Sequence, residues 1–352
     1  MVHGGEIYDK RIEHDFSVNL NPVPCPESVI KAMQDAALIV DQYPDITQNA
    51  FRSAVCDAEN LYIEETDRKL SPENIIGGSG ASELFAAIAK SIKPKKVLFP
   101  VPCFYGYYYA AAMIDAAVEE FELKAENGFA LDDSFIEEID ESVDLVFVAN
   151  PNNPTGRAID KAVLKRLVDK CKETVTFLVV DECFYRLSDS EGSARKYIFD
   201  YERLIVVDAY TKLFSIPGAR VGFGISSPDV IKGIKKHLPE WNMSVFSERA
   251  GEACADILMK TDFVKRSRAL IKTEREYLYN ELKEMGIKVY KSDANFLLIN
   301  CDTKLYEKLL SRGILIRECS NFTGLEQNYY RVAIKDHVAN DLFIRNIKEV
   351  LE

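Results

Sequence analysis

The sequence has no paired-cysteine motif, no long apolar run and no excess of positive charge. Its eight cysteines are scattered without C-x-x-C or Cys/His spacing, so we expect reduced thiols and no metal site. No uncharged apolar run reaches about 18 residues, and the N-terminus lacks an apolar signal region, which predicts a cytoplasmic protein with no membrane partner. The net charge of −12 makes the chain a poor general binder of nucleic acid.

What is present is an alternation of short apolar runs and helical patterns in the middle of the chain. The candidate strands are residues 97–99, 117–123, 145–149, 176–180, 204–207 and 221–225, and the candidate helices are residues 82–92, 159–171 and 228–237. Such alternation predicts an α/β fold with a largely parallel sheet. Ligands of these sheets bind beyond the carboxyl ends of the strands.

The pattern changes after Trp241. A helical tract is expected over residues 246–285, stopped by Gly286, and short strands are expected at 288–290, 296–300, 315–317 and 329–334 before a terminal helix. The first 40 or so residues lack a sheet of their own. We therefore predict a large domain of residues 40–240, and a smaller α+β domain formed by residues 1–39 and 241–352.

Lys212 stands five residues after the end of the apolar strand 204–207, in the segment into which this strand runs. Thr211 precedes it, and Arg220 follows eight residues later. A lysine delivered from a strand end can form a Schiff base with an aldehyde, while the hydroxyl and the guanidinium could hold a phosphate beside it. This combination is typical of a pyridoxal phosphate site. Because a lone lysine is usually a surface charge, the interpretation depends on partners elsewhere in the chain.

Two candidate partners also follow apolar strands. Asp181 ends the strand 176–180 and could pair with a pyridinium nitrogen, an interaction of about 4 kcal/mol at close range, although a lone aspartate there is more often a helix cap. Asn153, in the string NPNNPTG at 150–156, could donate to a ring oxygen; alone, that string is an ordinary turn.

Three weaker signals add further candidate residues to this site. The string GGSGASE at 77–83, with Gly80, Ala81 and Ser82, opens a predicted helix whose N-terminus could bind phosphate, or it is a glycine-rich turn with a serine cap. Phe104 could stack on the ring or pack in the core. Arg331, on a predicted strand, suits bidentate capture of a carboxylate, or it is a surface arginine.

The order and spacing of these residues are specific when taken together. Asn153 and Asp181 are 28 residues apart, Asp181 and Lys212 are 31 apart, and Lys212 and Arg220 are 8 apart. Over essentially its whole length the chain resembles fold type I pyridoxal phosphate enzymes of the aminotransferase class I/II superfamily. The resemblance implies the PLP-dependent transferase fold: a mostly parallel seven-stranded sheet between helices, plus a smaller α+β domain.

The resemblance also implies roles for these residues. Lys212 forms the Schiff base with the cofactor and later acts as the proton-transfer base, Asp181 pairs with the ring nitrogen, and Arg331 holds the substrate carboxylate. The remaining cofactor contacts are Asn153 at the ring oxygen, Phe104 on the ring face, and Gly80, Ala81, Ser82, Thr211 and Arg220 around the phosphate. Tyr43, in Tyr43-Pro44-Asp45, matches a tyrosine that reaches the phosphate of the neighbouring subunit, which implies a homodimer with shared sites.

Within the superfamily, two branches are similar: threonine-phosphate decarboxylases and histidinol-phosphate aminotransferases. The strings HGG at 3–5, DFSVNLNP at 15–22, LPEWN at 238–242 and GILIRECSNF at 313–322 resemble the decarboxylase branch more. Phe184 stands where many aminotransferases carry a tyrosine. Ala209 stands where relatives often have a phosphate-binding serine or threonine, which leaves room for a different phosphorylated or acidic amino acid.

We expect the substrate to be an amino acid that carries a phosphate. His3, Gly4 and Arg317 are expected to hold its distal phosphate, beside Asn19, Asn153 and Arg331, because two guanidiniums suit a substrate with a carboxylate and a phosphate. Three functions remain open at this point: decarboxylation of an O-phospho-amino acid such as threonine phosphate, amino-group transfer of the histidinol-phosphate type with 2-oxoglutarate or glutamate, and a non-catalytic protein of the same fold.

Overall fold

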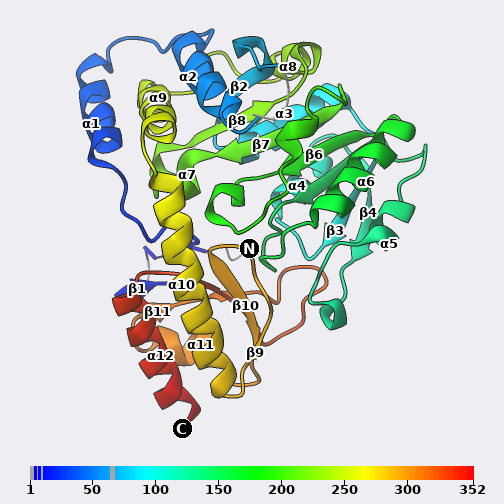
Figure 1. The fold of residues 1–352 in the computed structure, drawn as a ribbon. Coiled ribbons are helices and arrows are strands. Elements are labelled where there is room, and N and C mark those ends of the chain that lie inside the picture. Colours follow the sequence, from blue (N-terminus) through cyan, green and yellow to red (C-terminus); the bar gives the residue numbers. More distant parts are fainter. Residues whose placement is uncertain (1–3, 6, 9–10, 64–67) are drawn as a thin grey trace.

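A seven-stranded sheet forms the larger part of the computed structural model, which describes residues 4–5, 7–8, 11–63 and 68–352 (Figure 1). In spatial order the strands are β2 (Ile75–Ser79), β8 (Val221–Ile225), β7 (Leu204–Ala209), β6 (Phe177–Asp181), β5 (Leu145–Ala149), β3 (Lys96–Val101) and β4 (Ala117–Glu122). All neighbouring pairs from β7 to β4 are parallel, and β8 runs antiparallel to β7 and β2. The predicted mostly parallel sheet is confirmed.

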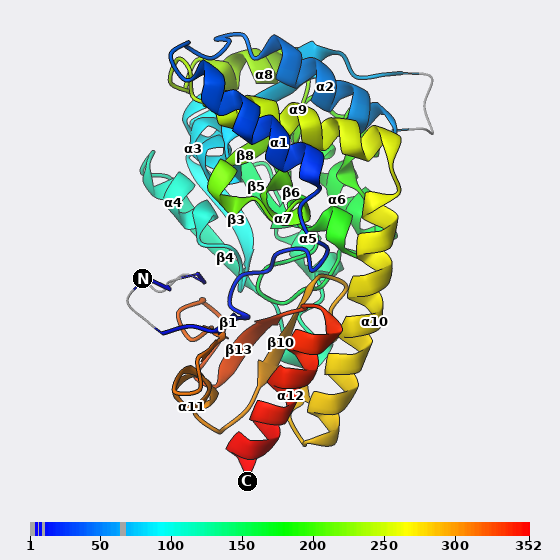
Figure 2. The same ribbon diagram turned by 90° about the vertical axis from the view of Figure 1, so that its left-hand side faces the viewer.

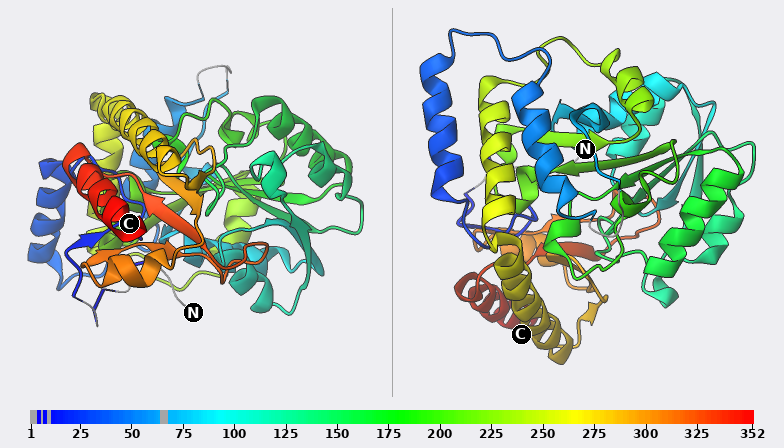
Figure 3. Two further views of the ribbon diagram at one scale, coloured as in Figure 1. Left: turned by 90° about the horizontal axis from the view of Figure 1, so that it is seen from below. Right: turned by 45° about the horizontal axis from the view of Figure 1, so that its top comes forward.

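Helices cover both faces of the sheet (Figures 1 and 3). Side chains that alternate along each strand build two cores, one on each face. Val97 and Phe99 lie in one core and Leu98 lies in the other, as the two-residue period of a strand requires. The first core includes α3 (Ala81–Ile92), α4 (Gly106–Ala112) and α8 (Pro228–Lys235). The second includes α2 (Asn49–Asn60), α5 (Asp133–Glu137), α6 (Lys161–Glu173) and α9 (Val245–Lys260).

Strand β2 was not among the predicted strands, because its glycines were interpreted as a loop. A Cβ on Gly77 would lie 2.3 Å from the Met243 sulfur, and one on Gly78 would lie 2.6 Å from Leu84 Cγ. The glycines therefore allow close packing on both faces of a strand rather than a turn.

A four-stranded antiparallel sheet forms the smaller part. Its order is β12 (Arg317–Glu318), β13 (Tyr329–Ala333), β10 (Phe296–Asn300) and β9 (Lys288–Val289), and α10 (Phe263–Glu284), α11 (Leu305–Leu310) and α12 (His337–Leu351) complete its core. Seen from below in Figure 3, the red C-terminal helix lies beside the orange strands. The N-terminal segment adds β1 (His14–Asp15), which pairs in parallel with β11 (Ile314–Leu315), and buries Phe16 in this core.

The tract expected to be one helix over residues 246–285 is two helices, so that expectation was wrong. Thr261 has extended backbone angles, φ −136° and ψ 167°, and its hydroxyl accepts from Phe263 N at 3.2 Å. Helix α9 packs on α1 (Glu27–Ala36) and α2, and α10 continues down to the small sheet (Figure 2). Val29 of α1 and Cys254 of α9 belong to the second core of the large sheet. The domain boundaries given above remain a prediction.

The other helical segments are short. They are α7 (Tyr210–Leu213) and the 3₁₀ turns Ala37–Ile39, Pro72–Asn74, Ala125–Asn127, Tyr185–Leu187, Ala194–Tyr197 and Pro217–Ala219.

Among the described residues, no helix is long and apolar enough to span a bilayer, and no group of three or more His, Cys, Asp or Glu side chains is arranged to hold a metal ion. The eight cysteines are free thiols.

Five buried charged side chains, here called the buried charge cluster, lie beneath the ends of β6 and β7. Arg195 Nε donates to Glu59 at 2.7 Å and also pairs with Glu182 and Asp208, while Arg186 bridges Glu59 and Asp208. No side chain of the cluster is more than 4% exposed, so each charge depends on its partners rather than on water. The cluster joins α2 to the end of β6, which carries Asp181, and to β7, which leads into the short helix that carries Lys212.

Candidate active site

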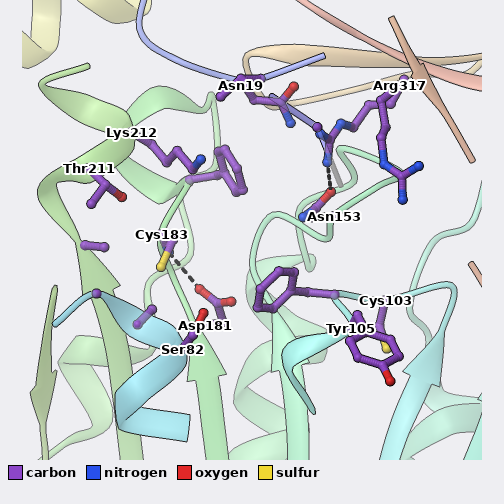
Figure 4. Close-up of a pocket in the computed structure, with 18 of the residues that line it drawn as sticks. Asn19, Ser82, Cys103, Tyr105, Asn153, Asp181, Cys183, Thr211, Lys212 and Arg317 are labelled. Carbon is purple, nitrogen blue, oxygen red and sulfur yellow. Dashed lines mark hydrogen bonds between the residues drawn. The ribbon is translucent and has the colours of Figure 1, made fainter. Parts of the chain in front are cut away.

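A pocket of about 350 Å³ opens where the carboxyl ends of the parallel strands meet the small sheet (Figure 4). It brings together nearly all the predicted site residues, which come from both sheets and from the N-terminal segment. They are Gly4, Asn19, Gly80, Ala81, Ser82, Phe104, Asn153, Asp181, Thr211, Lys212, Arg220, Arg317 and Arg331. Tyr43 does not line this pocket, and His3 lies outside the described residues.

Lys212 lies in the short helix α7 that follows β7, and its side chain points into the pocket (Figure 4). Burial, followed by the charge of Arg331, lowers the pKa of its ammonium group to about 8. The N-terminal segment holds the backbone of this turn, because Asn21 N donates to Lys212 O at 3.1 Å and Asn21 Nδ2 donates to Leu213 O at 2.8 Å. The structure therefore presents a half-buried amine that is readily deprotonated.

Asp181 is the last residue of β6 and is buried at the base of the pocket. Its Oδ2 accepts from the Tyr107 hydroxyl at 2.9 Å, and its Oδ1 accepts from Cys183 N at 3.0 Å. Burial raises the pKa of this carboxyl, and the bonds from Cys183 and Tyr107 oppose that rise. The carboxylate faces the same cavity as Lys212.

A group of residues suited to binding an anion lies at the junction of β2 and α3. It comprises Gly80, Thr211 and Arg220 and is here called the anion cradle. Gly80 has φ +80°, and a Cβ there would lie 2.3 Å from Arg220 Nη2. Arg220 itself donates to Ser79 O at 3.3 Å, and Thr211 lines the same pocket. The first backbone N–H groups of a helix have no partner within it, so the N-terminus of α3 adds donors to this cradle.

Arg331 and Arg317 are directly opposite each other on β13 and β12. Arg331 is buried, its Nη1 donates to Asn153 Oδ1, and its Nη2 donates to Ser17 O at 2.8 Å. Burial lowers the pKa of its guanidinium to about 10. Arg317 Nη2 donates to Asn321 Oδ1 at 2.7 Å. Two cationic groups thus lie on one wall of the pocket, and Asn153 keeps its Nδ2 available as a donor.

Asn19 lines the pocket with a side chain that is 2% exposed, and neither amide atom has a partner among the described residues. Gly4 lies nearby, and a Cβ there would be 2.3 Å from Ser17 O. Gly5 N donates to the Ser17 hydroxyl at 2.8 Å. The N-terminal segment therefore forms part of the pocket wall and carries unsatisfied polar atoms into it.

Some lining and supporting residues were not predicted. Tyr107, which contacts Asp181, was not among the predicted site residues. Its position three residues after Phe104, on a helical turn, is a signal that would have placed the two rings together. Asn321, Phe322 and Thr323, from the loop between β12 and β13, also line the pocket. Asn321 and Phe322 end the string 313–322 that resembles the decarboxylase branch, but they were not among the predicted site residues.

Tyr43 is 81% exposed and packs against Trp241, with ring centroids 4.8 Å apart. Other exposed apolar side chains on the same stretch of chain are Leu38, Val40 and Ile46. The chain does not use this tyrosine in its own pocket.

The chain matches the family described as aminotransferase class I and II over residues 11–347. It is 28% identical to the threonine-phosphate decarboxylase of Salmonella typhimurium, over 96% of this chain and 91% of that protein. It is also 28% identical to the histidinol-phosphate aminotransferase of Methanosphaera stadtmanae, over 95% of this chain and 89% of that protein. The solved histidinol-phosphate aminotransferase of Clostridium acetobutylicum superimposes with a TM-score of 0.85 at 30% identity, over 96% of this chain and 99% of that one.

Proposed function

Because the chain belongs to the aminotransferase class I and II family, whose members are pyridoxal phosphate enzymes, we propose that it decarboxylates an O-phospho-amino acid such as threonine phosphate. The observation that carries this proposal is the cross-strand pair Arg317 and Arg331, both in the pocket of Lys212. A substrate with a carboxylate and a phosphate offers one anionic group to each guanidinium.

The pocket residues fit the cofactor that the family implies. Lys212 would bind its aldehyde, Asp181 its ring nitrogen, and the cradle of Gly80, Thr211 and Arg220 its phosphate. Phe104 would cover the ring, with Asn153 Nδ2 at the ring oxygen and Ala81 and Ser82 beside the phosphate. When bound, pyridoxal phosphate withdraws electrons from Cα of the substrate.

In the proposed reaction, this chain's residues orient the substrate and move one proton. Arg331 would hold the carboxylate so that its bond to Cα lies perpendicular to the ring, and that bond breaks to release CO₂. Lys212 Nζ would then give a proton to the same Cα. Arg317, Gly4 and His3 would hold the distal phosphate, and Asn19 would donate to the substrate.

A second candidate is an aminotransferase of the histidinol-phosphate type, which the likeness to the Clostridium acetobutylicum enzyme favours. Here Lys212 would remove the proton from Cα instead, and the carboxylates of glutamate would occupy the two guanidiniums. The residues needed are the same, and the orientation of the substrate decides between the two reactions.

The deciding experiment uses the purified enzyme loaded with pyridoxal phosphate. O-phospho-threonine, O-phospho-serine and histidinol phosphate are added separately, and CO₂ release and conversion of the cofactor to its amine form are followed. We expect CO₂ from O-phospho-threonine without accumulation of the amine form. Amine formation without CO₂, reversed by 2-oxoglutarate, would establish the aminotransferase instead. Deleting residues 1–5 should raise KM for phosphorylated substrates much more than for unphosphorylated ones.

We also propose that two copies of the chain form a homodimer in which Tyr43 of each reaches the phosphate cradle of the other. Tyr43 and its exposed apolar neighbours Leu38, Val40 and Ile46 suit burial against a second subunit. Arg220, in the cradle, is itself exposed in the single chain, so that side of the site is open.

A further inference from the structure

Tyr107 touches two of the residues that are proposed to contact the cofactor ring. It lies on α4, is fully buried, and donates its hydroxyl proton to Asp181 Oδ2 at 2.9 Å. Its ring also meets the ring of Phe104 edge to face, with centroids 5.9 Å apart and planes at 83°. A single side chain therefore supports both the carboxylate below the ring nitrogen and the aromatic group on the ring face.

The packing around Tyr107 fixes the position of its phenolic oxygen. The ring stacks on Phe147 with centroids 5.0 Å apart and planes at 8°, and it makes an edge contact with Phe85 at 5.3 Å. Because these neighbours are buried aromatic groups of the first core, the phenol cannot rotate to another partner without disturbing that core. The hydrogen bond to Asp181 is thus built into the fold.

Asp181 is buried, so its ionised form depends on hydrogen-bond donors such as the Tyr107 hydroxyl. Burial raises the pKa of the carboxyl and so favours the neutral acid, which could not pair with a protonated ring nitrogen. The donors that oppose this effect are Cys183 and Tyr107. The hydrogen bond to the carboxylate oxygen Oδ2 comes from the Tyr107 hydroxyl.

We propose that Tyr107 is a positioning residue, which holds Asp181 as a carboxylate aimed at the cofactor ring nitrogen and thereby sets both cofactor affinity and electron withdrawal. This inference rests on the proposed function, since it requires pyridoxal phosphate in the pocket. It assigns a role in the chemistry to a residue that was not among the predicted site residues.

The test compares two ligands of the apo-protein: pyridoxal phosphate, and an analogue in which the ring nitrogen is replaced by a carbon–hydrogen group. The analogue cannot pair with Asp181 but keeps the aldehyde and the phosphate. In Tyr107→Phe we expect the affinity for pyridoxal phosphate to fall about 10- to 100-fold, as for loss of a bond to a charged group, with little change for the analogue. The pH dependence of the bound cofactor's visible absorbance should shift as well.

Tyr210→Phe is the matched control, because Tyr210 is also fully buried and its hydroxyl has no partner among the described residues. It should preserve the preference for pyridoxal phosphate over the analogue. Tyr107→His, which restores a ring N–H donor, should recover part of that preference. Thermal unfolding of each apo-variant identifies a variant that has not folded.

Equal loss of affinity for both ligands in Tyr107→Phe, or no loss for either, would overturn the inference and leave Tyr107 as a packing residue. If the unaltered chain binds neither ligand, the proposed function fails instead. The two failures are therefore distinguishable.

Discussion

At the scale of single residues, the reactive amine is prepared by its surroundings before any ligand binds. Burial and the nearby charge of Arg331 disfavour the protonated form of Lys212 and lower its pKa to about 8. Neutral amine, the nucleophilic form, is therefore present near neutral pH. The positive charge of Arg331, which lowers this pKa, is also the charge that would bind the carboxylate of the proposed substrate.

We predict that the rate at which the apo-protein captures pyridoxal phosphate rises with pH and is half-maximal near pH 8, because the amine reacts only when deprotonated. Stopped-flow absorbance measures the rate, and Nα-acetyl-lysine in the same buffers corrects for titration of the cofactor itself. Lys212→Arg should show no capture. A midpoint near that of the free lysine would contradict the prediction.

Asn19 supports a different prediction, because its buried amide has no partner among the described residues. Asn19→Ala loses no hydrogen bond within the described protein, so the free energy of unfolding of the apo-protein should change by less than about 1 kcal/mol. KM for the phosphorylated substrate should rise about 5- to 15-fold, the loss of one hydrogen bond to the substrate. A strong loss of stability with unchanged KM would show that Asn19 is structural.

At the scale of elements, the junction of β2 and α3 determines the anion cradle. Gly80 has backbone angles that only glycine adopts readily, and it lies against the guanidinium of Arg220. The donors of the cradle are therefore in place only when β2, the turn at Gly80 and α3 keep their relative positions.

Gly80→Ala should weaken binding of pyridoxal phosphate about 10- to 100-fold by displacing Arg220, and should destabilise the apo-protein by about 1–3 kcal/mol through backbone strain. Equilibrium titration and thermal unfolding measure the two effects. Gly128→Ala is the control: Gly128 also has positive φ, +62°, but a Cβ there meets nothing within 4 Å. It should lose stability without losing affinity, and equal affinity losses in both variants would refute the role of the cradle.

The elements that the sequence predicts well are those with a simple apolar signal. Strands β5 and β8 have the predicted bounds because each is a short, continuous, buried run. Strand β2 was missed because the close contacts of its glycines involve Met243 and Leu84, which are distant in sequence or on the next helix. The break at Thr261 was missed because apolar periodicity continues on both sides of it.

At the scale of the whole molecule, the site depends on contacts across long stretches of chain. Asp181 and Lys212 could be predicted because each lies at or shortly after the end of an apolar strand. The bond between Arg331 and Asn153 spans 178 residues, and that between Tyr107 and Asp181 spans 74. No local pattern encodes such pairs, and they follow only from the packing of the two sheets and the N-terminal segment.

The proposed dimer leads to a prediction on mixed subunits. Lys212→Ala and Tyr43→Ala should each be impaired alone, but a dimer of one of each contains one site with both residues native. Subunit exchange at equal amounts should therefore restore about a quarter of the native sites. Activity and the visible absorbance of the bound cofactor measure the recovery. Activity no higher than the sum of the separate variants would argue against a shared site.

The buried charge cluster also limits how this chain can diverge. Removing one member leaves an uncompensated charge away from water, which costs about 3–5 kcal/mol, a large share of the stability of a typical domain. In a library of random variants, single substitutions at these five positions should be depleted, whereas substitutions on the pocket wall should survive and change specificity. Homologous enzymes would then have altered these five positions jointly or retained them, while the substrate pocket adapted around them.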